Sequence, residues 1–185
     1  MINKFVKATL SAATVAAICT TTIAVAQEEQ QGSTSYSESD ITFTVDDQVQ
    51  LTGLSDIDLG TYSATDTGEV TGGDTFCVYV NGADDFTITA SNTANDASDF
   101  TLDEEGDGTD QIQYTVRVAN GDVATAAATA ALGYDSASGN LTGSNQRNCG
   151  GSDNTAVEIS VDEQEMREAT TGDYAGTLQL LVTPS

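Results

Sequence analysis

The residues best suited to chemistry in this chain are three cysteines, and their positions favour a structural bridge. Cys19 lies in a leader that we expect to be removed, so Cys77 and Cys149 remain as an even pair. Secreted chains keep such pairs as disulfides because their compartment is oxidising. A metal or redox site is disfavoured, since the chain has no histidine and no C-x-x-C spacing. We predict a Cys77–Cys149 disulfide. By restricting the unfolded chain, it would stabilise the fold by about 4 kcal/mol.

Other catalytic groups are scarce. Without histidine, Ser-His-Asp and Cys-His devices are impossible, and no glycine-rich phosphate-binding motif precedes a helix. Pairs of carboxylates occur throughout so acidic a chain, and none of them is informative. We therefore expect neither enzymatic activity nor a cofactor.

One acidic turn has part of the spacing of a calcium loop. From Asp103, acids occupy the first, third and fifth positions, and Gly108 occupies the sixth. The twelfth position, however, is Tyr114 instead of a bidentate glutamate. We expect a solvated turn and no metal, and a calcium-dependent envelope protein stays as an alternative.

The first 26 residues have the order of a secretory signal peptide. Lys4 and Lys7 precede an apolar stretch, and Ala24-Val25-Ala26 offers small residues for cleavage. The stretch is too short and too rich in threonine for a membrane-spanning helix. We predict a signal peptide over 1–26, a flexible lead-in over 27–47 and one domain over 48–185, with no direct membrane insertion after the leader is removed.

The mature chain is strongly acidic. After residue 26 there are three arginines against 29 acidic residues, which is a net charge of −26. Such a field repels phosphate, so we expect no nucleic-acid partner. Subunits of this charge also repel one another, and salt would screen that repulsion.

Alternating apolar residues predict an all-β domain. Period-two runs and punctuating Gly, Asn and Asp are typical of short strands and turns. Asn81-Gly82 between two such runs predicts a hairpin, and the alanine-rich segment 124–131 predicts a weak strand or loop. Asp162–Ala169 predicts a single helical turn. The expected strand segments are 41–51, 54–59, 76–80, 86–89, 100–102, 112–118, 157–161 and 174–182.

Seven or eight short strands indicate one antiparallel β-sandwich. The first alternating residues are Ile41, Phe43 and Val45, with Val49 continuing the pattern. On pattern alone they are the first strand of the chain's own sandwich. The terminal strand carries Tyr174, Leu178, Leu180 and Val182.

Several features in order resemble pilin subunits of the chaperone–usher pathway, including the spore-coat-U-like group. They are the leader, the alternating amino-terminal segment, the run Gly53–Gly60 and the cysteine strand 76–80. The closing Gly172-Asp173-Tyr174-Ala175-Gly176 is similar to the turn that opens the last strand of such pilins. The late position of Cys77 departs from many of them.

This resemblance implies an immunoglobulin-like sandwich that lacks its final strand and is completed by donor-strand exchange. Ile41, Phe43, Val45 and Val49 would then be donor-strand residues. The implied partners are other pilin subunits, a periplasmic chaperone and an outer-membrane usher, and the implied location is a surface fimbrium reached through the periplasm. The alternative is a self-contained secreted sandwich that serves as an adhesin or matrix module. Tyr174 is either a tyrosine corner or an ordinary aromatic at the core edge.

Overall fold

The computed structural model describes residues 39–83, 85–92, 98–105 and 110–185. The predicted signal peptide and most of the lead-in lie outside these residues. The chain divides into two compact units, Met1–Phe43 and Thr44–Ser185. Only residues 39–43 of the first unit are described, and Ile41 and Phe43 among them are 92% and 87% exposed. The second unit contains every strand described below.

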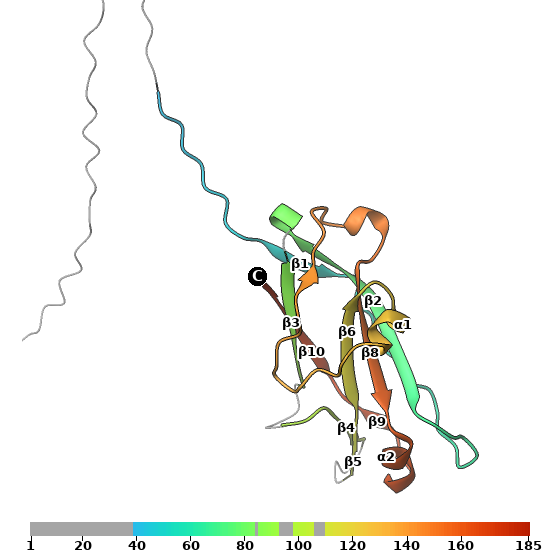
Figure 1. The fold of residues 1–185 in the computed structure, drawn as a ribbon. Helices are drawn as coiled ribbons and strands as arrows, with labels where there is room; N and C mark the ends of the chain where they lie inside the picture. Colours follow the sequence, from blue (N-terminus) through green and yellow to red (C-terminus); the bar gives the residue numbers. More distant parts are fainter. Residues whose placement is uncertain (1–38, 84, 93–97, 106–109) are drawn as a thin grey trace, which may run out of the picture. The chain divides into compact units, whose positions relative to one another are not determined.

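The second unit is all-β, and its named strands pair antiparallel. Four strands form one sheet in the order β1-β2-β8-β6, three form a second in the order β10-β3-β7, and three short strands form a third in the order β5-β4-β9 (Figure 1). The bounds are β1 Val49–Thr52, β2 Val70–Val80, β3 Asp85–Asn92, β4 Thr101–Glu104, β5 Gln111–Gln113, β6 Thr115–Asn120, β7 Leu141–Thr142, β8 Thr155–Val161, β9 Tyr174–Ala175 and β10 Leu178–Pro184.

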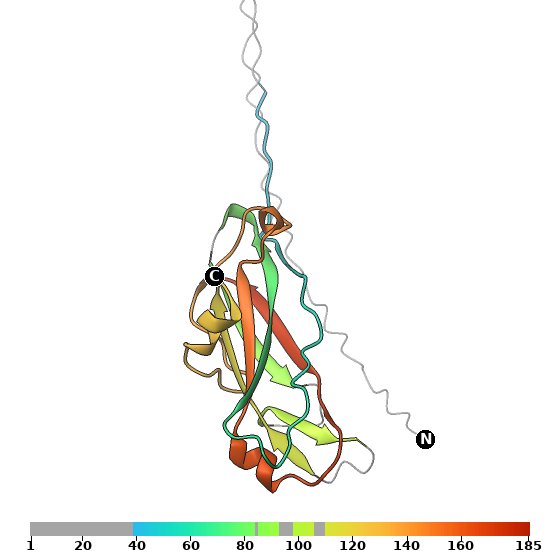
Figure 2. The ribbon, with the colours of Figure 1, turned by 90° about the vertical axis from the view of Figure 1, so that its right-hand side faces the viewer.

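The core lies between the first and second sheets, which form the two layers of a sandwich (Figure 2). In β3 every second residue is buried, as the alternation of apolar residues predicts. The first sheet contributes residues of β2, β6 and β8, and the second contributes those of β3. The fully buried members include Phe76, Val78, Phe86, Ile88, Val116 and Val157. The prediction of an antiparallel β-sandwich is therefore confirmed.

The outer face of the first sheet is covered by a short helix that the sequence pattern does not predict. Helix α1, Val123–Ala127, begins where the Asp122 side chain accepts a hydrogen bond from the Thr125 N–H. Its Ala126 is fully buried against alanines of β6 and β8. The prediction of a strand or loop here was wrong because Asp122 supplies an N-cap. By contrast, the predicted turn near residue 165 is helix α2, Glu163–Glu168.

Other local predictions were wrong. The predicted strands 112–118 and 174–182 are each divided between two sheets, the first as β5 and β6 and the second as β9 and β10. The Asn81-Gly82 turn does not close a hairpin, because β2 and β3 belong to different sheets and the turn carries the chain between layers. Gly82 has a φ of 87°, which suits this sharp change of direction. Residues 54–59 form no strand either, and the bond from the Ser55 N–H to Asp74 (2.6 Å) instead ties this segment to β2.

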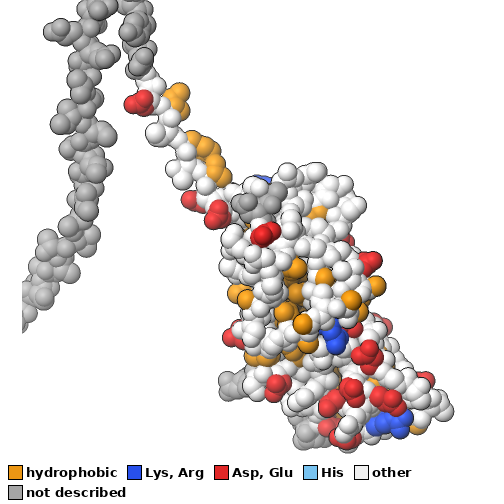
Figure 3. Space-filling view, in the orientation of Figure 1, with side chains coloured by type: hydrophobic (Ala, Val, Ile, Leu, Met, Phe, Trp, Pro, Cys, Tyr) orange, Lys and Arg blue, Asp and Glu red, His pale blue; other side chains and the backbone are white. Residues whose placement is uncertain are grey.

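A buried ion pair lies on the outer face of the first sheet. Glu158 of β8 is 2% exposed, and Arg117 of β6 lies 2.9 Å from its carboxylate. The same guanidinium donates to the Ser160 hydroxyl (2.8 Å). Elsewhere the surface is acidic, and Figure 3 shows carboxylate side chains spread over the lower part of the domain. In the part of the chain that is described, no helix is long and apolar enough to cross a bilayer.

Candidate functional site

The candidate site is the free edge of β10, which is also the last strand of the chain. The order β1-β2-β8-β6 corresponds to strands A, B, E and D of an immunoglobulin sandwich, and β10-β3 corresponds to F and C. The seventh strand, G, would lie beside β10. Among the described residues no strand pairs with β10 on that side.

The hydrogen bonds of β3 show which groups β10 presents at this edge. The Ile88 N–H and C=O bond to Ser138 at 2.9 and 2.8 Å, and the Ala90 C=O accepts from the Asp135 N–H at 2.9 Å. These two residues therefore turn their backbone away from β10. Because antiparallel pairs alternate, it is Thr87, Thr89 and Ser91 that bond to β10.

Their partners in β10 are Thr183, Leu181 and Gln179. It follows that Leu178, Leu180 and Val182 direct their N–H and C=O groups to the free edge. The same three side chains point toward the core, since they pack against it and are half-buried. In the central strand β8 every residue is buried. The free edge thus combines unpaired backbone groups with incompletely covered apolar side chains.

Among the residues that the structure describes, strand β1 also has no partner on its outer side, and this second free edge is close to β10. Val78 and Val80 bond to Ser144 through their backbone, so they turn away from β1. By the same alternation, Val49 and Leu51 direct their backbone groups away from β2. Leu51 is half-buried on the core and Val49 is 36% exposed. We call the free edges of β1 and β10, with these five apolar residues, the acceptor edge.

This geometry corrects one predicted site residue. The sequence pattern groups Val49 with the donor-strand residues, but Val49 lies in β1 opposite Val80 and belongs to the acceptor edge. Ile41, Phe43 and Val45 are in no strand, and Val45 is 61% exposed. Their donor role stays a prediction.

The predicted disulfide is present. The Cys77 and Cys149 sulfur atoms lie 2.01 Å apart, and the bridge links β2 to the loop before β8. Cys77 pairs with Thr52, the last residue of β1. The bridge therefore holds β2, the strand with which β1 of the acceptor edge pairs.

Tyr174 lies in β9, just before β10, and behaves as a tyrosine corner. Its hydroxyl lies 2.8 Å from the Asp110 carboxylate and 3.0 Å from the Thr170 C=O, four residues upstream, and its one proton can be donated to either of them. The Thr170 N–H also donates to Asp110 (2.6 Å). These bonds, with that from the Thr170 N–H the largest, lower the pKa of Asp110 to about 2. They fix the turn from which β10 starts.

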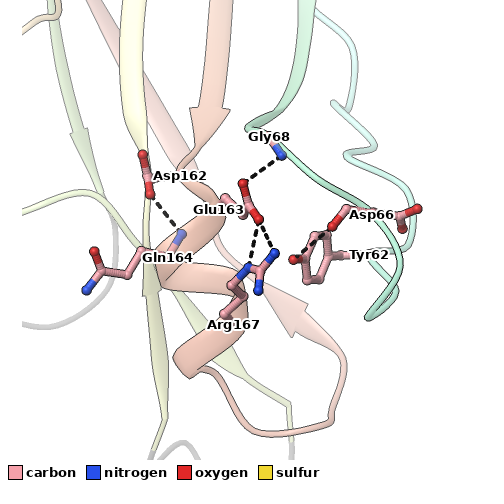
Figure 4. A network of polar contacts seen from close by, with 7 residues as sticks. All are labelled: Tyr62, Asp66, Gly68, Asp162, Glu163, Gln164 and Arg167. Atoms are coloured by element: carbon pink, nitrogen blue, oxygen red, sulfur yellow. Dashed lines mark hydrogen bonds and ion pairs between the residues drawn. The ribbon is translucent and has the colours of Figure 1, made fainter.

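A second polar network ties the connection between β1 and β2 to helix α2 (Figure 4). Glu163 accepts a hydrogen bond from the Gly68 N–H (2.8 Å) and forms an ion pair with Arg167. The bond from Gly68 and the contact with Arg167 lower the pKa of Glu163. This connection also carries Ile57 and Leu59, which pack half-buried against the core.

No model of a known protein family matches the chain, and no curated protein matches it. Among solved structures it is similar to one described as "Chaperone-tip adhesin complex is vital for synergistic activation of CFA/I fimbriae biogenesis". The identity is 15% and the TM-score 0.45, over 75% of this chain and 41% of that one. The chain thus spans less than half the length of that neighbour, and a likeness at this level supports no conclusion about function.

Proposed function

We propose that this chain is a structural subunit, shaft or adaptor, of a surface pilus that assembles by donor-strand complementation. The observation that carries the proposal is the free edge of β10, which offers the N–H and C=O groups of Leu178, Leu180 and Val182 beside half-covered apolar side chains. An added strand would satisfy these groups and cover the side chains. Left open, such an edge invites aggregation.

The lead-in has the composition of the strand that this edge needs. Ile41, Phe43 and Val45 alternate with threonines, and all three are exposed. Burying three such side chains is worth roughly 5 to 9 kcal/mol before ordering costs. Backbone pairing along the edge adds to this.

Chain length favours donation to a neighbour over self-completion. The Ser185 N–H bonds to the Asp85 C=O, so β10 ends beside the start of β3. Gln48 bonds to Asn81 near the same point, so β1 begins there too. An antiparallel partner of β10 would start at this end and run to the other, a distance of about 23 Å for seven residues.

To lie antiparallel on its own β10, the five-residue segment Ile41–Val45 would run about 17 Å along the edge, and the chain would then have to turn and return over that length to reach β1. Only Asp46, Asp47 and Gln48 are available for the return, and three residues span at most about 10 Å. The edge of a second copy imposes no such limit. This favours a polymer in which each subunit completes the next.

The proposal extends to a non-enzymatic role, export through the periplasm and help from a periplasmic chaperone and an outer-membrane usher. A chaperone would cover the acceptor edge until a neighbour replaces it. Genes for such a pair beside this one would support that route.

The test uses the mature chain from residue 27 and a variant that lacks residues 27–47. We expect the mature chain to form polymers, and an excess of a synthetic peptide of residues 38–47 to cap them as monomers. The shortened variant should bind the peptide and stay folded but add no further subunit. A mature chain that is a stable monomer and unfolds when residues 27–47 are removed would instead identify a self-contained module.

A further inference from the structure

We propose that Asn81 is the positioning residue that fixes how the lead-in leaves the domain. The inference rests on the proposed function, in which this segment links one subunit to the next. Asn81 Oδ1 accepts a hydrogen bond from the Gln48 N–H (2.7 Å), and Asn81 Nδ2 donates to the Asp46 C=O (2.8 Å). The Asn81 N–H donates to the Gln48 C=O (3.1 Å). We call these three bonds the Asn81 contact.

The Asn81 contact holds the chain on both sides of Asp47, immediately before β1. Asp46–Gln48 form no strand, so the side chain of Asn81 provides the hydrogen bonds that hold this backbone beside β2. The amide side chain supplies a donor nitrogen and an acceptor oxygen on separate atoms, and this arrangement uses both of them. The position of Asn81 is itself fixed, because the preceding residue, Val80, is buried in the core and 1% exposed.

Arg147 makes a second contact with the same segment. Its Nη2 atom donates to Gln48 Oε1 at 3.5 Å, and its guanidinium lies 5.7 Å from the centre of the Tyr79 ring. Cys149, two residues further on, is bonded to Cys77 of β2. The disulfide therefore secures the loop that brings Arg147 to Gln48.

These contacts act on the only residues left to connect two subunits. If Ile41–Val45 pair with a neighbour, Asp46, Asp47 and Gln48 are the whole link to β1. Fixing the backbone of a short link removes rotations between the bodies that it joins. The Asn81 contact thus sets the angle between successive subunits and limits its spread.

The chain offers a matched control. Asn120 is also followed by glycine, and its side chain also bonds to backbone groups, namely the N–H and C=O of Thr142 and the C=O of Asn154. None of these groups belongs to the segment before β1. Asn120→Ala therefore removes a comparable set of bonds without touching the link.

The test compares fibres of the full mature chain with fibres of Asn81→Ala and Asn120→Ala by electron microscopy. We expect the persistence length to fall by about half or more in Asn81→Ala, because the link gains freedom, and to stay unchanged in Asn120→Ala. An unchanged Asn81→Ala fibre, or an equal fall in both variants, would overturn the inference.

A second measurement separates this inference from the proposed function. In the monomer filled with the peptide of residues 38–47, the Gln48 amide should exchange about tenfold faster in Asn81→Ala, since its acceptor is lost. In Asn120→Ala, the Gln48 amide should exchange at the wild-type rate. Equal rates in all three proteins would refute the Asn81 contact. If the wild type makes no fibres and binds no peptide, the proposed function fails. The same exchange measurement on the monomer without peptide then still shows whether the Asn81 contact exists.

Discussion

Val182 of β10 and Ile88 of β3 face each other as a non-hydrogen-bonded pair, because both backbone groups of Ile88 bond to Ser138 instead. Val182 consequently turns its own N–H and C=O to the free edge. The same relationship holds for Leu180, opposite Ala90. The alternation makes the two edges of β10 chemically distinct, and single substitutions can address each edge separately.

Proline substitutions in β10 should separate folding from assembly. Leu180→Pro removes an N–H that faces the free edge, so the domain should fold and lose most of its capacity to accept a strand. Leu181→Pro removes an N–H that bonds to Thr89, and we expect a loss of about 1–3 kcal/mol of unfolding free energy. Urea denaturation measures the second effect, and titration with the peptide of residues 38–47 measures the first. Equal peptide binding by Leu180→Pro and the wild type would contradict the assignment of the edge.

Polar substitutions in the lead-in should abolish donation and leave the domain unaffected. Ile41→Asp and Phe43→Asp alter exposed side chains, so the unfolding free energy of the peptide-filled monomer should change by less than about 0.5 kcal/mol. Polymer formation, followed by light scattering, should be lost. Thr42→Ser and Thr44→Ser change the intervening positions and should polymerise normally. Polymers formed by Phe43→Asp at the wild-type rate would show that another segment is the donor.

Acid should weaken the turn before β10 in a defined pH range. The hydrogen bonds from Thr170 and Tyr174 lower the pKa of Asp110 to about 2, below its ordinary value of 3.8. The stabilisation is therefore complete above the ordinary pKa and is lost as the pH falls from about 4 to about 2. Asp110→Asn cannot titrate and should lack this part of the pH dependence. Urea midpoints measured between pH 2 and pH 5 compare the two proteins, and parallel curves would exclude the role of Asp110.

The two members of the buried ion pair should differ in their cost of removal. Arg117→Met leaves the Glu158 carboxylate buried without its charge partner, and we expect a loss of about 3–5 kcal/mol. Glu158→Gln leaves Arg117, which is 23% exposed and can be partly hydrated, so the loss should be smaller. Thermal unfolding of both variants tests this order. A larger loss in Glu158→Gln would mean that the burial of Glu158 does not dominate the energetics.

Much of the fold could be predicted because its strands alternate regularly. Ile112 and Val116 lie in strands as their spacing indicates, but in two strands, β5 and β6, instead of the single predicted one. The evenness of the cysteine count predicted the bridge between Cys77 and Cys149. Both signals are local or compositional. They do not depend on which strands are neighbours.

What could not be predicted depends on pairing between distant segments. Val49 has the same alternation whether it donates a strand or belongs to β1, and only its register with Val80 decides between these. Asn81 reads as a turn residue, and its bonds to Asp46 and Gln48 arise from a separation of more than 30 residues. The Asp122 cap is the exception, because an aspartate just before the alanine-rich segment is a preferred N-cap residue that the sequence shows.

Pro184 has a consequence for copies that meet before assembly. It is the last residue of β10 and lies opposite Phe86, whose backbone faces away from β10, so its ring occupies the position where a further edge N–H would be. Two exposed β10 strands that met side by side could form a ladder over Leu178–Val182 but could not extend it through Pro184. This shortens the ladder that two copies could form between their β10 strands, while a strand from another segment could still occupy the central positions.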